Sequence, residues 1–93
     1  MARLTKVWDN SELYTVDDDK VNHDINGYSG EAIIRLAKFE NIYDDLVASQ
    51  IKIAAELETL RNEGKKNSVK FKELLGKKLM NSYIITIFKT NEL

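Results

Sequence analysis

The sequence predicts a mainly α-helical protein with a small β-hairpin at its N-terminus. A stretch of about 32 residues lacks glycine and proline and carries apolar side chains at alternating spacings of three and four, and a shorter stretch of similar character follows a glycine-containing break. The clearest strand-like segments lie near the start of the chain. With 93 residues, the chain suits a single domain over 1–93, in which 1–29 forms a hairpin and loop and 30–93 a helical hairpin.

The first expected element is a two-stranded β-hairpin, with strands at about 4–8 (LTKVW) and 13–16 (LYTV). Both segments are rich in β-branched and aromatic residues, and the polar residues between them, DNSE, suit a turn. Because an isolated two-stranded hairpin is only marginally stable in water, we expect it to pack on another part of the protein. A polar loop is expected from 17 to 29.

A first long helix is expected at about 30–62. Ser29 or Gly30 can start it, and Glu31 would then lie at the positive end of the helix dipole. Apolar residues occupy seven of the eight positions of a seam that is typical of coiled coils. The eight seam positions are Leu36, Phe39, Tyr43, Leu46, Gln50, Ile53, Leu57 and Leu60.

A second helix is expected at about 68–88, running antiparallel to the first. Gly64 suits the left-handed position after a helix end, and Asn67 or Ser68 suits the next N-cap. A short connection favours an antiparallel pair, in which contacting residues have numbers that sum to about 132. This register predicts contacts of Leu60 with Phe71, Leu57 with Leu75, Ile53 with Leu79 and Gln50 with Ser82.

The second helix is apolar around more of its circumference than one partner helix can cover. Beside the face that carries Phe71 and Leu79, a neighbouring stripe contains Gly76, which would allow close helix approach near Ala54 and Ala55. We therefore predict a homodimer or higher homo-oligomer, most simply a four-helix bundle made by two hairpins. The predicted self-association residues are Met80, Tyr83, Ile84, Ile87 and Phe88.

The segment NHDINGYSGE resembles the start of a calcium-binding EF-hand loop in its spacing. Asn22, Asp24 and Asn26 alternate ahead of Gly27, but the twelfth loop position, which requires a bidentate glutamate, is Ile33. We interpret the segment as a turn that leads into the first helix, and we predict no metal site and no cofactor.

Three consecutive carboxylates, Asp17, Asp18 and Asp19, form a candidate contact for a protein partner. Clustered acids can bind hard cations or mimic nucleic-acid phosphates, although most such clusters are solvated loops.

A lysine-rich segment, GKKNSVKFKELLGKK, contains six lysines and one glutamate and so has a local net charge of +5. On a helix, Lys66, Lys70 and Lys77 share a face that could follow a phosphate backbone. Three features argue against nucleic-acid binding: the overall net charge of −1, the lack of arginine in this segment and the lack of a helix-turn-helix pattern. Nucleic-acid binding is therefore the alternative function.

Composition excludes several other classes of function. The chain has no cysteine and a single histidine, His23, which removes disulfides, cysteine-based zinc sites and His-rich catalytic groups. The start lacks the apolar core of a signal peptide, and the longest apolar-rich stretch is about half of the roughly 20 residues that a membrane span needs. We expect a cytoplasmic, non-enzymatic protein–protein interaction module that acts as a small adaptor, regulator, inhibitor or assembly protein without membrane contact.

Overall fold

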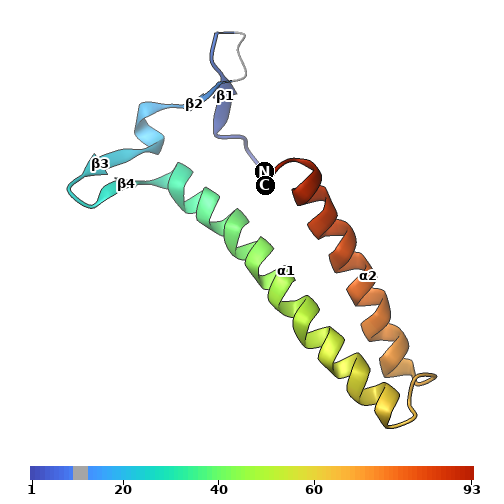
Figure 1. Ribbon diagram of the computed structural model, residues 1–93. Helices are drawn as coiled ribbons and strands as arrows, with labels where there is room; N and C mark the ends of the chain where they lie inside the picture. Colours follow the sequence, from blue (N-terminus) through green and yellow to red (C-terminus); the bar gives the residue numbers. More distant parts are fainter. Residues whose placement is uncertain (10–12) are drawn as a thin grey trace. The chain divides into compact units, whose positions relative to one another are not determined.

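The computed structural model describes residues 1–9 and 13–93, and it confirms a mainly helical protein (Figure 1). Two short antiparallel β-hairpins precede two helices that pack together. The chain divides into two compact units, Met1–Glu40 and Asn41–Leu93, and the boundary falls inside the first helix. The expectation that 1–93 forms a single domain stays a prediction.

The first hairpin joins β1 (Thr5–Val7) to β2 (Tyr14–Val16). Lys6 lies opposite Thr15, and beyond the paired strands the Trp8 N–H donates a hydrogen bond to the Leu13 carbonyl at 2.9 Å. This confirms the expected hairpin, with slightly shorter strands. Most of the turn predicted at 9–12 lies outside the described residues.

A second hairpin replaces most of the polar loop expected from 17 to 29, so that expectation was wrong. A 3-10 helix, η1 (Asp18–Lys20), leads into β3 (Asn22–Asp24), which pairs with β4 (Gly27–Ser29). The chain reverses between these strands because Asp24 Oδ1 accepts a hydrogen bond from the Asn26 N–H at 2.8 Å, a local turn that asparagine and aspartate favour. The His23 and Tyr28 rings stack across the pair at 4.4 Å.

The first helix, α1 (Glu31–Asn62), begins directly after this hairpin at Gly30. The Gly30 carbonyl accepts a hydrogen bond from the Ile34 N–H at 3.0 Å, which confirms the predicted start. Gly30 has φ 111°, and a Cβ at this position would lie 2.9 Å from the Lys20 carbonyl oxygen. Glycine is therefore required here for both conformation and space.

The connection between the helices uses the predicted capping residues. Gly64 has φ 73°, the Gly64 N–H donates to the Arg61 carbonyl at 3.0 Å, and the Lys65 N–H donates to the Leu60 carbonyl at 2.8 Å, which together form a Schellman motif. The second helix, α2 (Val69–Thr90), starts at Ser68, whose hydroxyl accepts a hydrogen bond from the Phe71 N–H at 3.2 Å.

We expect Ser68→Ala to lower the free energy of unfolding by about 1 kcal/mol, because it leaves an amide at the start of α2 without its side-chain acceptor. Urea unfolding followed by circular dichroism measures this loss. Ser68→Thr is the matched control, since its hydroxyl can accept the same bond and can also donate to the Lys65 carbonyl, as Ser68 does at 2.7 Å. An equal loss in both variants would contradict a capping role.

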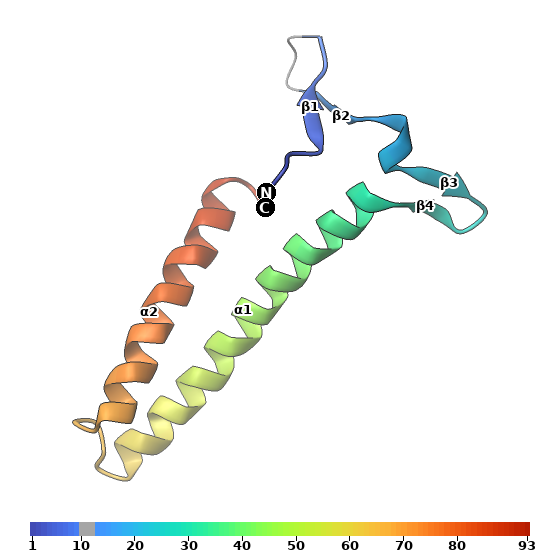
Figure 2. The same cartoon turned by 180° about the vertical axis from the view of Figure 1, so that it is seen from behind.

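The hydrophobic core of the second unit lies between α1 and α2, which run antiparallel (Figure 2). Ile53, Leu57 and Phe71 are buried, and Leu57 is only 1% exposed. Leu60 and Leu74 pack against them. Closer to the end of α2, the Tyr43 and Phe88 rings contact each other with centroids 5.4 Å apart.

The face of α2 that packs on α1 differs from the predicted one. Leu75 and Leu79 were expected opposite Leu57 and Ile53, but both are exposed, and Asn81 is buried at 6% exposure. The buried or half-buried positions of this face of α2 again alternate by three and four, and two of them are polar. They are Phe71, Leu74, Lys78, Asn81, Ile85 and Phe88.

Hydrogen bonds join the two helices in this arrangement, and the Asn81–Ser49 bond is the one that the predicted face lacked. Gln50 Nε2 donates to Ser82 Oγ at 2.8 Å and to the Lys78 carbonyl at 3.0 Å, and Asn81 Nδ2 donates to Ser49 Oγ at 3.4 Å. The predicted Gln50–Ser82 contact is thus confirmed, whereas the predicted Ile53–Leu79 contact is wrong. We call Ser49, Gln50, Lys78, Asn81 and Ser82 the polar layer. Within the described part of the chain, Gln50 Oε1 is buried without a hydrogen-bond partner.

Candidate interaction surfaces

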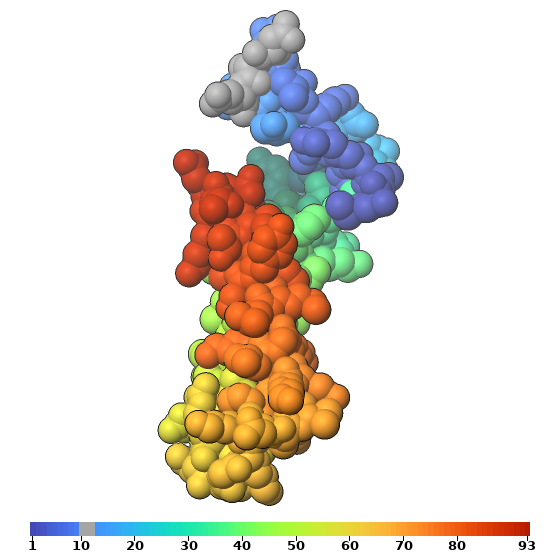
Figure 3. All heavy atoms as spheres, turned by 90° about the vertical axis from the view of Figure 1, so that its right-hand side faces the viewer, coloured from blue at the N-terminus to red at the C-terminus, as the bar shows by residue number. Residues whose placement is uncertain are grey.

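The side of α2 that faces away from α1 carries a continuous row of exposed apolar side chains. Figure 3 shows α2, in orange to red, lying open toward the viewer. Leu79, Met80 and Tyr83 are 65%, 63% and 69% exposed, and Ile87 is exposed one turn further on. Their spacing places all four on one side of the helix. We call Leu79, Met80, Tyr83 and Ile87 the apolar stripe.

The five residues predicted for self-association divide into two groups. Met80, Tyr83 and Ile87 belong to the apolar stripe. Ile84 and Phe88 are half-buried, and the Phe88 ring contacts Tyr43 within the hairpin. Leu79 was not predicted as a surface residue, because its spacing from Phe71 and Leu75 matches that of a seam.

Gly76 lies one turn before Met80, on the same side of α2. A Cβ at Gly76 would meet no atom within 4 Å, so the predicted close approach to Ala54 and Ala55 within the hairpin is wrong. The rotation that directs Asn81 toward α1 turns Gly76 outward. A glycine in the interior of a helix costs roughly 0.5 to 1 kcal/mol relative to alanine, and packing within the hairpin gives no reason for it.

The acidic residues Asp17, Asp18 and Asp19 lie at η1, and two of them are ion-paired within the chain. Lys6 Nζ lies 2.6 Å from Asp17 Oδ1, and Lys20 Nζ lies 3.9 Å from Asp19 Oδ2. The hydrogen bond from Lys6, with its positive charge, lowers the pKa of Asp17, and the same bond raises the pKa of Lys6. A hydrogen bond to Glu31 likewise raises the pKa of Lys20.

We expect the pKa of Asp17 to rise toward its ordinary value of 3.8 in Lys6→Gln, because that substitution removes both the hydrogen bond and the charge. A lowered carboxyl pKa stabilises the fold above the pKa of the unfolded chain, and this contribution is lost as pH falls through the folded value. Both side chains are exposed, so the effect on stability is small. NMR titration of the carboxyl carbon measures the pKa, with Lys38→Gln as control. An unchanged titration midpoint in Lys6→Gln would contradict the pairing.

The candidate nucleic-acid contacts, Lys66, Lys70 and Lys77, are all exposed. No ion pair involves any of the three among residues 1–9 and 13–93. Lys78, by contrast, is half-buried in the polar layer. Lys66 lies in the turn before the Ser68 cap and not on α2, so the predicted common helix face was wrong for this residue. Lys70 and Lys77 remain on α2 as exposed lysines without an ion pair among the described residues.

The residues that resemble an EF-hand loop form the second hairpin, where Asp24 accepts a hydrogen bond from the backbone of Asn26. In the part of the chain that the structure describes, no group of three or more histidine, cysteine, aspartate or glutamate side chains could hold a metal ion. No helix among the described residues has both the length and the apolar character to cross a membrane.

Comparison with known proteins gives no relative: no family model, no curated protein and no solved structure matches the chain.

Proposed function

We propose that this chain is a non-enzymatic protein-interaction module that self-associates through the apolar stripe of α2. The simplest assembly is a homodimer in which two helical hairpins form a four-helix bundle. The observation that carries the proposal is the exposure of Leu79, Met80, Tyr83 and Ile87 side by side. Large apolar side chains that are exposed next to one another are typical of protein–protein interfaces.

A second copy of the same chain is the partner that these features favour. From Leu79 to Phe88, α2 contains no charged residue, so a partner that covers the stripe should also present an uncharged surface. The same stripe on another copy supplies one, and a two-fold axis brings identical patches together. The described residues bury only three large apolar side chains, Ile53, Leu57 and Phe71, which is a small core. Association would add the apolar burial that a chain of this size needs.

Light scattering coupled to size-exclusion chromatography tests the proposal directly. A homodimer has twice the 10.7 kDa mass of the chain at micromolar concentration. A monomer under these conditions would contradict self-association. In a dimer, the acidic residues Asp17, Asp18 and Asp19 would remain a candidate contact for a different protein of basic character, consistent with an adaptor, regulator, inhibitor or assembly role.

We expect Gly76→Ala to separate folding from association. The added methyl group meets open space within the chain, so the isolated hairpin should gain about 0.5 to 1 kcal/mol in stability. The same methyl group would hold a partner helix away and weaken the dimer. Analytical ultracentrifugation measures the dissociation constant, and urea unfolding at low concentration measures stability. Lys77→Ala, at an exposed position beside the stripe, is the control. If the Gly76→Ala variant dimerises as tightly as the wild type, the partner helix does not pack against Gly76.

The second candidate function is nucleic-acid binding through Lys66, Lys70 and Lys77, and it is supported by the absence of ion pairs to these lysines among the described residues. Contacts to phosphates release counterions, so such binding should fall steeply between 50 and 200 mM salt. Retention of DNA or RNA at low salt, lost in Lys70→Glu, would support this function. Absence of retention at low salt would remove it.

A further inference from the structure

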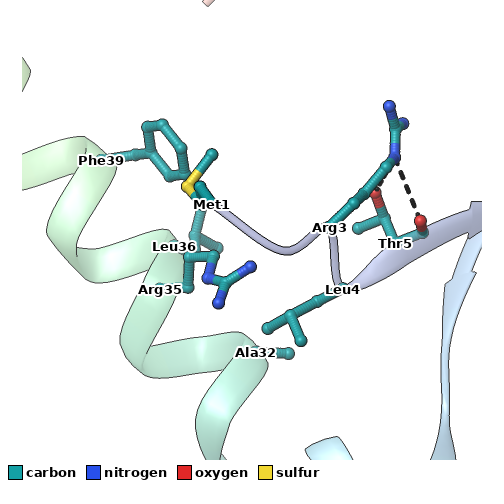
Figure 4. A pocket seen from close by; sticks show the side chains of 8 residues that line it. All are labelled: Met1, Arg3, Leu4, Thr5, Ala32, Arg35, Leu36 and Phe39. Carbon is teal, nitrogen blue, oxygen red and sulfur yellow. Dashed lines mark hydrogen bonds between the residues drawn. The ribbon is translucent and has the colours of Figure 1, made fainter.

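The first unit contains an open pocket of about 350 Å³ between the N-terminal residues and the first turns of α1 (Figure 4). Most of its lining is hydrocarbon, and none of its lining residues is acidic. The pocket is lined by Met1, Arg3, Leu4, Thr5, Ala32, Arg35, Leu36 and Phe39.

The apolar wall of the pocket continues the seam of α1. Leu36 and Phe39 were predicted as seam residues, but they are 56% and 41% exposed. Met1 and Leu4 flank them from the N-terminal segment (Figure 4). Met1 and Leu4 thus add hydrocarbon to the wall that Leu36 and Phe39 form on α1.

Arg35 supplies a partly buried positive charge at this wall. Its side chain is 27% exposed and donates a hydrogen bond to the Ala2 carbonyl. Among the described residues, its only carboxylate partner is Glu31, at 3.9 Å. Lys20 holds the same Glu31 more closely, at 3.2 Å. The guanidinium charge is therefore only loosely paired, and a partly buried cation of this kind favours an added anion.

The two arginines of the pocket point in different directions. Figure 4 shows the Arg35 guanidinium directed toward the segment that carries Met1 and Leu4, next to Leu36. Arg3 extends away from α1, and its Nε donates to the carbonyl and the hydroxyl of Thr5 at 3.1 Å each. Arg35 is thus the group placed to hold an anionic head.

We propose that this pocket binds a small amphiphilic carboxylate, whose tail lies on Leu36 and Phe39 and whose head pairs with Arg35. The volume is near the lower end of ligand pockets, which hold roughly 300 to 1,000 Å³. If each heavy atom occupies about 30 Å³, as a water molecule does in the liquid, the pocket holds about a dozen heavy atoms. A medium-chain fatty acid has this size. The pocket lies outside the apolar stripe, so the two proposals stand or fall separately.

Isothermal titration calorimetry of the full chain with decanoate tests this proposal. We expect sub-millimolar binding, and we expect Arg35→Gln to weaken it by about tenfold or more, because a charge-assisted hydrogen bond is lost. Lys38→Gln removes the same charge from an exposed position outside the pocket and should bind as the wild type does. Decanol, which lacks the anionic head, should bind at least tenfold more weakly than decanoate.

NMR of the wild-type chain provides a readout that does not depend on the folding of a variant. Decanoate should shift the signals of Leu4, Leu36 and Phe39 and leave those of Tyr83 and Ile87 unchanged. Absence of shifts at the pocket would overturn the proposal, as would equal binding of decanol and decanoate. Binding of an acidic, leucine-rich peptide that depends on Arg35, without binding of decanoate, would also overturn it and indicate a protein ligand.

Discussion

The double substitution Tyr83→Glu with Ile87→Glu is expected to convert the proposed dimer into a monomer of 10.7 kDa. Both side chains are exposed in the isolated chain, so the hairpin should keep its helical content. In a dimer, each substitution would bury an unpaired carboxylate against an uncharged surface, which costs several kcal/mol. The dissociation constant should rise by about a thousandfold or more, because about 4 kcal/mol corresponds to that factor.

Light scattering measures the mass of this variant, and circular dichroism checks that it is folded. Lys70→Glu is the control, because it introduces the same side chain at an exposed position of α2 outside the apolar stripe. We expect it to retain the wild-type mass. A double variant that remains a folded dimer would move the interface away from α2, and a monomeric Lys70→Glu would mean that association depends on charge.

Leu57→Ala is expected to lower the free energy of unfolding by about 2 to 5 kcal/mol. Leu57 is the most completely buried large side chain of the described residues, at 1% exposure, and it lies in a cluster with Ile53 and Phe71. Removing three carbon atoms leaves a cavity that the neighbouring side chains fill only in part. Since a stable small domain has about 5 to 15 kcal/mol in total, this loss is a large fraction of it.

Urea unfolding at a fixed protein concentration measures the effect, because the stability of a dimer depends on concentration. Lys52→Ala is the matched control, since Lys52 is an exposed residue of α1 next to the buried Ile53. We expect that variant to stay within about 0.5 kcal/mol of the wild type. A loss below 1 kcal/mol in Leu57→Ala would show that the cluster around Leu57 is not the stabilising core.

Sequence reasoning predicted the parts of the fold that local chemistry determines. The start of α1 at Gly30, its end before Gly64 and the cap at Ser68 follow from the conformations and hydrogen bonds that these residues favour. The Gln50–Ser82 pair was also predicted, because the short connection between the helices restricts their register.

The rotation of α2 and the second hairpin depend on information that periodicity does not contain. Apolar spacing favoured Leu79 in the seam, but α2 instead turns Asn81 toward α1, where its amide donates a hydrogen bond to Ser49. The strands β3 and β4 have three residues each and a polar composition, so neither shows the alternation that identifies a strand.

The candidate surfaces were predictable to different degrees. Met80, Tyr83 and Ile87 follow from the excess of apolar surface on α2, which a single neighbouring helix cannot cover. The pocket at Arg35 could not be predicted, since it exists only where the N-terminal segment packs against α1. No sequence motif links Arg35 to Leu4.

The polar layer gives α2 two chemically different sides, because Asn81 faces α1 whereas the apolar stripe faces outward. If α2 turned so that Leu79 met Ile53, the hairpin would bury more hydrocarbon but would separate Asn81 from Ser49. With leucine in place of both Gln50 and Asn81, these polar contacts would no longer favour one rotation over the other, and we expect the hairpin to specify a single packing less strictly. Apolar substitutions in the polar layer are therefore expected to make it less certain which side of α2 faces outward, and so to weaken the selection of a partner.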